Sequence, residues 1–431
     1  MRRDSEKTVK EFLTNRLEHS PVLLVQGARQ VGKTFMVTSL LGERERVISI
    51  NLERQPQAKL EIDSTRDFSE FTQWLETRHH FQDGTDWTIY IDEAQESEKL
   101  GSYIRFMKEE WRYTKTILSG SSMCKIFPDK QRVPVGRIQY LTLHPFSFRE
   151  FLRCGEKDAL LNKAEEAEEQ IPSFLHQQLL ELYDEYLFVG GMPEVVKTYF
   201  EKKDYKEIFN FIIASQRDDF LRKEQTKSYL FIDALKGIAN HVGSSGKYTH
   251  ISTNIYDAKK IIQNLIDWFI VYQLDIVGSL PTQSFQPKRY LFDIGILRHL
   301  RETAVPRISV LNTIDEQLRT PLGGILENVV YLSLLQGKGG YIPISAWKLS
   351  NKNPLEIDFI YKEEDVIFPI EVKAALKLKS RHFLNLIHYA KLHRLREGVV
   401  ISLANKETFK PSSDLKIRNI PAYLFNGPDL F

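Results

Sequence analysis

The residues best suited to chemistry near the start of the chain form a phosphate-binding pattern. The segment GARQVGKT, from Gly27 to Thr34, fits GxxxxGK[ST] and stands between an apolar run and a helical pattern. Its glycines let backbone N–H groups curl around phosphates, Lys33 can reach the β- and γ-phosphates, and the Thr34 hydroxyl can ligate Mg²⁺. A plain glycine turn is the alternative. We predict an ATP and Mg²⁺ site whose nucleotide contacts come from Gly27, Ala28, Arg29, Gln30, Val31, Gly32, Lys33, Thr34 and Phe35.

A pair of adjacent carboxylates follows the second strand pattern after the phosphate-binding segment. In TIYIDEAQ, at 88–95, four residues suited to a buried strand are followed by Asp92 and Glu93. Beside a phosphate-binding loop, Asp92 can hold Mg²⁺ through water, and Glu93 can orient or deprotonate the attacking water. A strand followed by an acidic helix cap would look the same in isolation. We expect Asp92 to help hold the metal and Glu93 to act as the base.

Two further polar residues are candidates for a role in hydrolysis. Ser121 lies in the turn SGSS after an apolar run, where a polar side chain could contact the γ-phosphate or the lytic water. A serine-rich turn that caps a helix is the alternative. Arg137, in VGRIQ, could serve the nucleotide of a neighbouring subunit in trans, or could be a surface arginine.

The C-terminal part of the chain carries a second candidate site. Asp358 ends the short strand pattern LEID, and Glu371 and Lys373 follow on the strand pattern FPIEVK. Residues two apart on a strand share a face, and a hairpin can bring Asp358 beside them. Two carboxylates that hold a metal and a lysine beside the scissile phosphate suit Mg²⁺-dependent phosphodiester hydrolysis, and Glu327 on the preceding helix could add a ligand. The alternative is the ordinary alternation of a half-buried strand.

Strands and helices alternate along the first 150 residues. This alternation predicts a parallel sheet with helices on both faces. The expected strands are 22–26, 47–52, 88–92, 116–120 and 138–143, and 67–81 is an expected helix.

Helical patterns dominate after residue 150, and mixed patterns return near the end. The turn VGGMPEVV, at 189–196, interrupts the helical region. The expected helices are 146–152, 173–188, 228–242, 257–269 and 326–335, and the expected strands are 270–277, 356–362 and 366–373.

The segment 248–277 could be a winged helix. Ser252 or Thr253 would cap or end a turn, a recognition helix would run from 257 to 268, and the following strands would form the wing. Lys259 and Lys260 could meet DNA phosphates. An internal packing module without nucleic acid is the alternative.

Composition narrows the class of protein. The 431 residues are 42% hydrophobic and 27% charged, which is ordinary for globular domains. A net charge of +2 means that a nucleic-acid surface would have to be a local patch. The two cysteines stand in no metal or disulfide pattern, the charged N-terminus MRRDSEKTVKEF has no signal-peptide core, and no apolar stretch has the length of a membrane span. We expect a cytoplasmic protein with no membrane partner.

The order of motifs resembles a family of prokaryotic AAA-type ATPases whose C-terminal half is a separately named domain of unknown function. The resemblance covers almost the whole chain, and the stretch KIFPDKQRVP is a departure from it. The matching segments are QGARQVGKT, IDEAQ, ILSGSS, VGRIQYLTLHPFSFREFL, YLFVGGMPEVV, KRYLFDIGILRHL, LENVVYLSLL, EIDFIYK and FPIEVKAA.

The resemblance implies an α/β fold with four parts. These are an AAA-like P-loop core at 1–150, a helical lid at 151–227, a winged-helix-like region at 228–300 and a restriction-endonuclease-like domain at 301–431. Two functions are consistent with it. The first is an ATPase coupled to DNA binding or processing through a nuclease-like domain. The second is a nucleotide-switched binding protein whose C-terminal fold is catalytically inactive. The expected partners are ATP, DNA and further copies of the chain.

Overall fold

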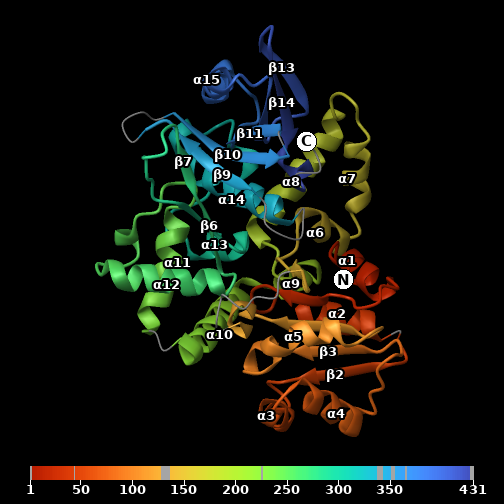
Figure 1. Ribbon diagram of the computed structural model, residues 1–431. Helices are drawn as coiled ribbons and strands as arrows, with labels where there is room; N and C mark the ends of the chain where they lie inside the picture. The colour runs from red at the N-terminus through yellow and green to blue at the C-terminus, as the bar shows by residue number, and fades with distance from the viewer. Residues whose placement is uncertain are drawn as a thin grey trace. The chain divides into compact units, whose positions relative to one another are not determined.

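The computed structural model describes residues 2–42, 44–127, 136–224, 227–336, 343–350, 355–364 and 366–427. Most of the stretch KIFPDKQRVP lies outside these ranges. The chain divides into two compact units (Figure 1). The first comprises residues 2–144 with 267–269, and the second comprises 145–266 with 270–431. Within the second unit, the boundaries at 227 and 300 remain predictions.

The first unit is built on a parallel five-stranded sheet in the order β2-β3-β4-β1-β5. All five predicted strands are present, and the predicted helix 67–81 is α4. The helices are α1 (Glu6–Thr14), α2 (Lys33–Leu41), α3 (Pro56–Ser64), α4 (Phe68–His79) and α5 (Leu100–Glu109). The strands are β1 (Val22–Gln26), β2 (Val47–Asn51), β3 (Thr88–Asp92), β4 (Lys115–Gly120) and β5 (Ile138–Thr142).

The sheet of the first unit positions its polar residues through burial and register. The central strands β3 and β4 are buried along their whole length, as expected for strands covered on both faces. Asn51, Asp92 and Ser119 are aligned across three neighbouring strands at or near their carboxyl ends. Ligands of open parallel sheets bind at this edge, and the phosphate-binding loop follows β1 there.

The second unit joins helices to two sheets. Its helices are α6 (Phe148–Cys154), α7 (Asp158–Glu165), α8 (Ser173–Val189), α9 (Pro193–Phe200), α10 (Lys206–Glu224), α11 (Ser228–Asn240), α12 (Ile255–Asp267), α13 (Ile294–Leu300), α14 (Thr320–Gln336) and α15 (Leu384–His393). Its strands are β6 (Val271–Leu274), β7 (Ile276–Gly278), β8 (Lys288–Leu291), β9 (Ile344–Lys348), β10 (Glu356–Glu363), β11 (Val366–Lys373), β12 (Glu397–Ser402), β13 (Glu407–Ser412) and β14 (Leu415–Pro421).

The larger sheet of this unit is mixed, in the order β13-β14-β12-β11-β10-β9-β7. A hydrophobic cluster joins this sheet to α15, and Trp347, Leu386 and Tyr389 are among its members. The predicted hairpin is confirmed, since β10 and β11 are antiparallel neighbours. Asp358, however, does not end a strand as predicted; it is the third residue of β10, which continues to Glu363.

The middle region differs from the prediction in two details. The expected strand 270–277 is two strands in different sheets: β6 pairs with β8, whereas β7 pairs with β9 of the larger sheet. The residue that caps α12 is also neither Ser252 nor Thr253, although Ser252 fulfils the other predicted role: its hydroxyl accepts from the backbone N–H group of Asn254, at 3.1 Å, and so closes a turn. The side chain of Asn254 accepts from the backbone N–H groups of Tyr256 and Asp257, at 3.0 and 3.4 Å.

Candidate functional site

The phosphate-binding loop has the backbone shape that its glycines predict. Gly27 has φ 143° and Gly32 has φ 95°, and these values favour glycine. A Cβ atom on Gly27 would lie 2.2 Å from the carbonyl oxygen of Leu143. The loop therefore runs against the end of β5, and α2 begins at Lys33 as predicted.

Lys33 is buried and holds its own loop together. Its ammonium group donates to the carbonyl oxygens of Gly27, at 2.9 Å, and Ala28, at 2.8 Å. Burial lowers the pKa of Lys33 to about 8, although the negative charges of Glu93 and Asp92 oppose this effect. The lysine therefore bonds to neutral carbonyls that a phosphate could replace.

Asp92 is the centre of the polar network at the carboxyl edge of the sheet. One carboxylate oxygen accepts from the Thr34 hydroxyl, at 2.9 Å, and from the Asn51 amide, at 2.8 Å. The other accepts from the Ser119 hydroxyl, which is also 2.9 Å from the Tyr90 hydroxyl. Thr34 and Asp92 were predicted, whereas Asn51 and Ser119 were missed, although both follow apolar residues at the ends of strand patterns.

Thr34 and Asp92 fit the coordination expected of Mg²⁺ bound with a nucleotide. The Thr34 hydroxyl donates to an Asp92 carboxylate oxygen at 2.9 Å, so the two oxygens are neighbours, and both are ligands of the kind that this cation prefers. Asn51 and Ser119 fix the orientation of the carboxylate, as outer partners of metal ligands do.

Glu93 lies directly after β3 in a left-handed backbone conformation, with φ 54°. Its carboxylate accepts from the Gln95 side chain, at 2.5 Å. The charge of Glu93 is the largest influence that opposes the burial of Lys33. The predicted base therefore lies within electrostatic reach of the phosphate-binding lysine.

The other predicted residues of the first unit are less closely tied to this network. The Ser121 hydroxyl is buried and has no hydrogen-bond partner among the described residues, and the serine that contacts Asp92 is Ser119. Arg29 makes an ion pair of 3.7 Å with Glu53. Phe35 is 63% exposed, so its ring is open to solvent beside the loop.

Arg137 does not join the nucleotide site of its own chain. Its guanidinium group bonds Glu109 at the end of α5, at 2.7 and 3.0 Å. Its carbonyl oxygen accepts from the N–H group of Val22, the first residue of β1. Arg137 therefore lies at the amino edge of the sheet, opposite the phosphate-binding loop.

The second predicted site lies in the second unit and is shaped by a β-bulge. Between Ile357 and Ile360, the pairing of β10 with β9 shifts so that Asp358 and Phe359 stand where one residue is expected. Bulges of this kind redirect side chains next to functional sites. One oxygen of Asp358 accepts from the backbone N–H group of Val372, at 2.9 Å.

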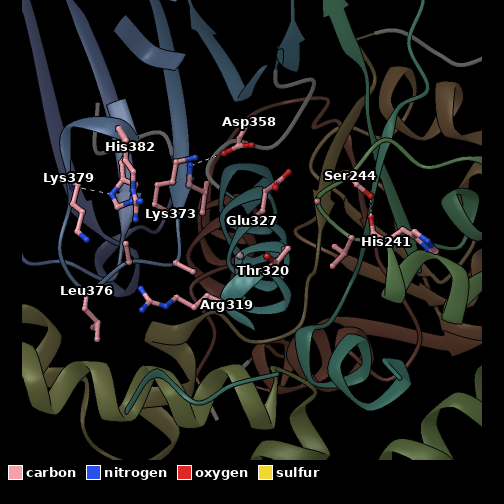
Figure 2. A pocket seen from close by; sticks show the side chains of 18 of the residues that line it. His241, Ser244, Arg319, Thr320, Glu327, Asp358, Lys373, Leu376, Lys379 and His382 are labelled. Atoms are coloured by element: carbon pink, nitrogen blue, oxygen red, sulfur yellow. Dashed lines mark hydrogen bonds between the residues drawn. The ribbon is translucent and has the colours of Figure 1, made fainter. Parts of the chain in front are cut away.

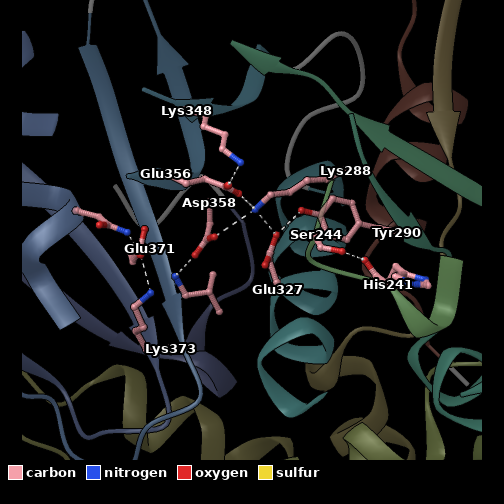
Figure 3. Close-up of polar contacts among 12 residues, drawn as sticks. His241, Ser244, Lys288, Tyr290, Glu327, Lys348, Glu356, Asp358, Glu371 and Lys373 are labelled. Carbon is pink, nitrogen blue, oxygen red and sulfur yellow. Dashed lines mark hydrogen bonds and ion pairs between the residues drawn. The ribbon is translucent and has the colours of Figure 1, made fainter. Parts of the chain in front are cut away.

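A buried lysine that the sequence reasoning missed lies among the carboxylates. Lys288, the first residue of β8, is 1% exposed. Its ammonium nitrogen lies 2.7 Å from Glu356 and 3.3 Å from Asp358. It also lies 2.9 Å from Glu327, which accepts from the Tyr290 hydroxyl at 2.6 Å (Figure 3). The sequence feature that could have indicated Lys288 is its position at the start of the apolar run KRYLF.

The charges of this cluster are strongly coupled. Burial lowers the pKa of Lys288, but Glu327, Asp358 and Glu356 outweigh burial and raise it well above its usual value. Burial raises the pKa of Asp358, but Lys288 and Lys373 outweigh burial and leave it below its usual value. Burial raises the pKa of Glu327 to about 7. Lys288 is therefore a stably charged ammonium group.

Glu371 and Lys373 form a separate pair beside this cluster. They share a face of β11 as predicted, with 2.5 Å between the ammonium nitrogen and one carboxylate oxygen. The other oxygen of Glu371 is buried and has no hydrogen-bond partner among the described residues. Burial, and then the charge of Asp358, raise the pKa of Glu371 to about 7. Asp358 and Glu371 thus lie near each other but bond to different lysines.

A divalent cation that bridges Glu327 and Asp358 does not fit this arrangement. In the part of the chain that the structure describes, no group of three or more histidine, cysteine, aspartate or glutamate residues is placed to hold a metal. The predicted ligands Glu327 and Asp358 instead converge on the Lys288 ammonium group. The predicted metal function of Glu327 is therefore not supported by this geometry, whereas a metal shared by Asp358 and Glu371 stays a prediction.

A pocket of about 890 Å³ opens beside the cluster. Glu327 and Asp358 reach its wall from α14 and β10, and Lys373 and Lys379 line the opposite side (Figure 2). Its basic lining residues are His241, Arg301, Arg319, Lys373, Lys377, Lys379, Arg381 and His382. Since its two acidic residues are already bonded to Lys288, the pocket favours an anion.

The fold and the loop geometry define the first unit as a P-loop ATPase domain of the AAA type. Residues 19–152 match the family described as an AAA domain. Two families match the second unit, both described as a domain of unknown function: DUF8612 over residues 180–307 and DUF4143 over residues 322–423.

Individual proteins similar to the chain add little about its activity. A Haemophilus influenzae protein described as uncharacterized is 23% identical over 388 residues, which is 85% of this chain and 86% of that protein. The Walker-type ATPase of Pyrococcus abyssi has a TM-score of 0.43 and 15% identity, covering 70% of this chain and 95% of that one. The Aeropyrum pernix ORC1 protein, solved with DNA, has a TM-score of 0.30 and 16% identity, covering 68% and 89%. These structural likenesses are weak, and the assignment rests on the AAA match and the site geometry.

The structure contains no helix, in its described ranges, that is both long and apolar enough to cross a membrane.

Proposed function

We propose that the chain hydrolyses ATP with Mg²⁺ and that its nucleotide state governs its binding of DNA. The observation that carries the first part is the network around Asp92, which joins the phosphate-binding loop through Thr34 to the strand that precedes Glu93. Bound Mg²⁺ would neutralise charge on the β- and γ-phosphates, with Thr34 and Asp92 as its protein partners.

Different residues of the chain contribute to different steps of hydrolysis. Lys33 leaves the carbonyl oxygens of Gly27 and Ala28 and bonds to the phosphates. Glu93 accepts a proton from the attacking water, and Gln95 holds its carboxylate. Ser121, whose buried hydroxyl is unpaired, is proposed to contact the γ-phosphate or the water.

The test is the rate of phosphate release by the wild type with and without DNA, alongside Glu93→Gln and Ser121→Ala. We expect Glu93→Gln to bind ATP without turnover. We expect DNA to change the rate of ATP hydrolysis by the wild type. If the bound nucleotide changes the affinity for DNA, then bound DNA must in turn change the affinity for the nucleotide. If the rate of ATP hydrolysis is the same at every DNA concentration, the coupling is refuted, but the proposed ATPase activity is not.

Two basic features of the second unit support DNA as the partner. Most of the ionisable residues that line the pocket beside Asp358 are basic, and Lys259 and Lys260 lie on α12, which a two-stranded sheet follows. Lys259→Ala with Lys260→Ala should weaken binding alike on all sequences, and wild-type affinity should fall steeply with salt. Lys362→Ala on β10 is the matched surface-charge control. Affinity that does not depend on salt would argue against a phosphate-binding surface.

The C-terminal part of the chain has two candidate functions, nuclease and binding domain. The proximity of Asp358, Glu371 and Lys373 is consistent with a restriction-endonuclease-like fold. The presence of Lys288 among the carboxylates favours a binding domain without cleavage, because it occupies the position at which Glu327 and Asp358 converge. Nicking of supercoiled plasmid with Mg²⁺ or Mn²⁺ by the wild type, abolished in Asp358→Ala, would establish the nuclease.

A further inference from the structure

The C-terminal carboxylate cluster already contains a cation of its own. The ammonium nitrogen of Lys288 lies within 3.3 Å of three carboxylates, which come from α14 and β10. A lysine ammonium group has three N–H donors, and each carboxylate can receive one. With 1% of its surface exposed, Lys288 cannot turn into solvent and leave the carboxylates to another ligand without moving β8.

The distances show why Lys288 and a divalent metal that bridges Glu327 and Asp358 exclude each other. Oxygen ligands approach Mg²⁺ at about 2.1 Å and Ca²⁺ at about 2.4 Å. A metal that bridges Glu327 and Asp358 would stand between the same two oxygens that Lys288 bonds at 2.9 and 3.3 Å. The hydrogen bond from Tyr290 to that Glu327 oxygen, at 2.6 Å, and the bond from the Val372 N–H group to Asp358 further hold the arrangement.

The pocket next to the cluster provides the cationic surface that a phosphate needs. Lys373 and Lys379 face it (Figure 2), and among the described residues Arg319 bonds only a backbone carbonyl oxygen, that of Ile314, at 2.9 Å. In the described part of the chain, Lys377 and Lys379 have no ion pair with an acidic residue, so their charges remain available. Basic residues on a pocket of this size suit contact with consecutive phosphates of a nucleic acid strand.

We propose that Lys288 takes the place of a divalent cation in this cluster, so that the second unit holds nucleic-acid phosphodiesters in the adjacent pocket without cleaving them. This deepens the DNA-binding half of the proposed function and does not depend on ATP turnover. The carboxylates then serve to fix Lys288, β8 and the hairpin beside the pocket, and the basic residues of the pocket hold the phosphates.

The first experiment measures Mn²⁺ binding to full-length, nucleotide-free protein by calorimetry or electron paramagnetic resonance. Wild type and Asp358→Asn should bind Mn²⁺ equally weakly. Lys288→Met should gain binding at least about tenfold tighter that is lost again in Lys288→Met with Asp358→Asn. Lys348→Met is the matched control, because Lys348 also pairs with Glu356, at 3.6 Å, but bonds neither Glu327 nor Asp358.

Several results would overturn the proposal. These are Mn²⁺ binding by the wild type that depends on Asp358, no gain in Lys288→Met, or an equal gain in Lys348→Met. If Lys288→Met does not fold, Lys288→Met with Glu356→Gln removes one of the carboxylates left unpaired and repeats the test. The comparison of wild type with Asp358→Asn needs no lysine variant and can refute the proposal by itself.

The second experiment distinguishes a failure of this proposal from a failure of the proposed function. Wild type should bind a fluorescent DNA duplex and leave supercoiled plasmid intact with Mg²⁺ or Mn²⁺. Lys377→Ala with Lys379→Ala should weaken binding by about tenfold or more and reduce its dependence on salt. Wild-type nicking that Asp358→Asn abolishes would refute the role of Lys288. Unchanged DNA binding in the double variant would refute the pocket, and absence of DNA binding by the wild type would refute the proposed function.

Discussion

Replacing Lys33 with methionine should remove the binding of ATP while leaving the fold of the first unit nearly unchanged in stability. In the nucleotide-free protein the Lys33 ammonium group is buried, and its pKa is lowered to about 8. Holding it charged at neutral pH costs about 3 kcal/mol relative to water, since a tenfold change in proton affinity corresponds to about 1.4 kcal/mol. Methionine fills a similar volume and removes that cost.

The loss of two hydrogen bonds opposes this gain. Without the ammonium group, the carbonyl oxygens of Gly27 and Ala28 lose their donor, and each buried acceptor left unpaired costs about 1–3 kcal/mol. At the middle of that range the two effects nearly cancel, and across it the free energy of unfolding should fall by no more than about 3 kcal/mol. ATP, in contrast, loses charge-assisted bonds worth about 1.5–3 kcal/mol each, which raises the Kd by about 10²–10⁴-fold for two bonds.

Thermal unfolding with and without Mg²⁺ and ATP measures both effects. At an ATP concentration of about 100 Kd, the nucleotide stabilises the wild type by about 2.7 kcal/mol. For a unit of this size, that free energy corresponds to a rise in Tm of roughly 10 °C. Lys33→Met should show a rise of less than about 2 °C at the same concentration. Thr34→Ser keeps the hydroxyl and serves as the control. A full Tm shift in Lys33→Met would refute the assignment of the loop.

Three further outcomes are expected. Glu93→Gln should keep ATP affinity in a fluorescent-nucleotide assay while phosphate release falls by about 10²–10⁴-fold, and turnover at the wild-type rate would rule out Glu93 as the base. If Arg137 acts in trans, Arg137→Ala should lower hydrolysis about tenfold or more at unchanged ATP affinity, whereas Glu109→Gln should not; equal losses would indicate a structural ion pair. Burial raises the pKa of Asp293 to about 6, so the folded protein keeps a proton that the unfolded chain has lost between pH 4 and 6. Asp293 should contribute a fall of up to about 3 kcal/mol in stability in urea as pH rises through this window, and Asp293→Asn should remove this contribution from the slope.

The fold of the first unit follows closely from its sequence. The strands β1, β3 and β4 each have a short apolar run that is buried on both faces and bounded by polar segments. This pattern specifies a parallel sheet without knowledge of distant contacts. The second unit was harder to predict, because the run 270–277 has strand character throughout and nothing local indicates that β6 and β7 pair with different partners.

The two candidate sites differ in the same way. The phosphate-binding loop and the carboxylates of β3 are contiguous motifs, so their types and spacing identified Lys33 and Asp92. Asn51 lies beside Asp92 because of the register between β2 and β3, and the strand patterns in the sequence only partly predict that register. Lys288 enters the C-terminal cluster from a strand far away in the chain, and Asp358 meets it through a bulge that the alternation of side chains could not predict.

The contrast between the two buried lysines explains why one can take part in a reaction cycle and the other cannot. Lys33 bonds neutral carbonyl oxygens. The charged oxygens of a polyphosphate would bond Lys33 more strongly than these carbonyl oxygens do. Lys288 bonds three carboxylates, and a phosphate offers it nothing better. A divalent cation placed about 4 Å from its charge would be repelled by about 8 kcal/mol at an effective dielectric constant of about 20. Nucleotide exchange can therefore move the first lysine in every cycle, whereas metal binding at the second requires that the lysine be removed.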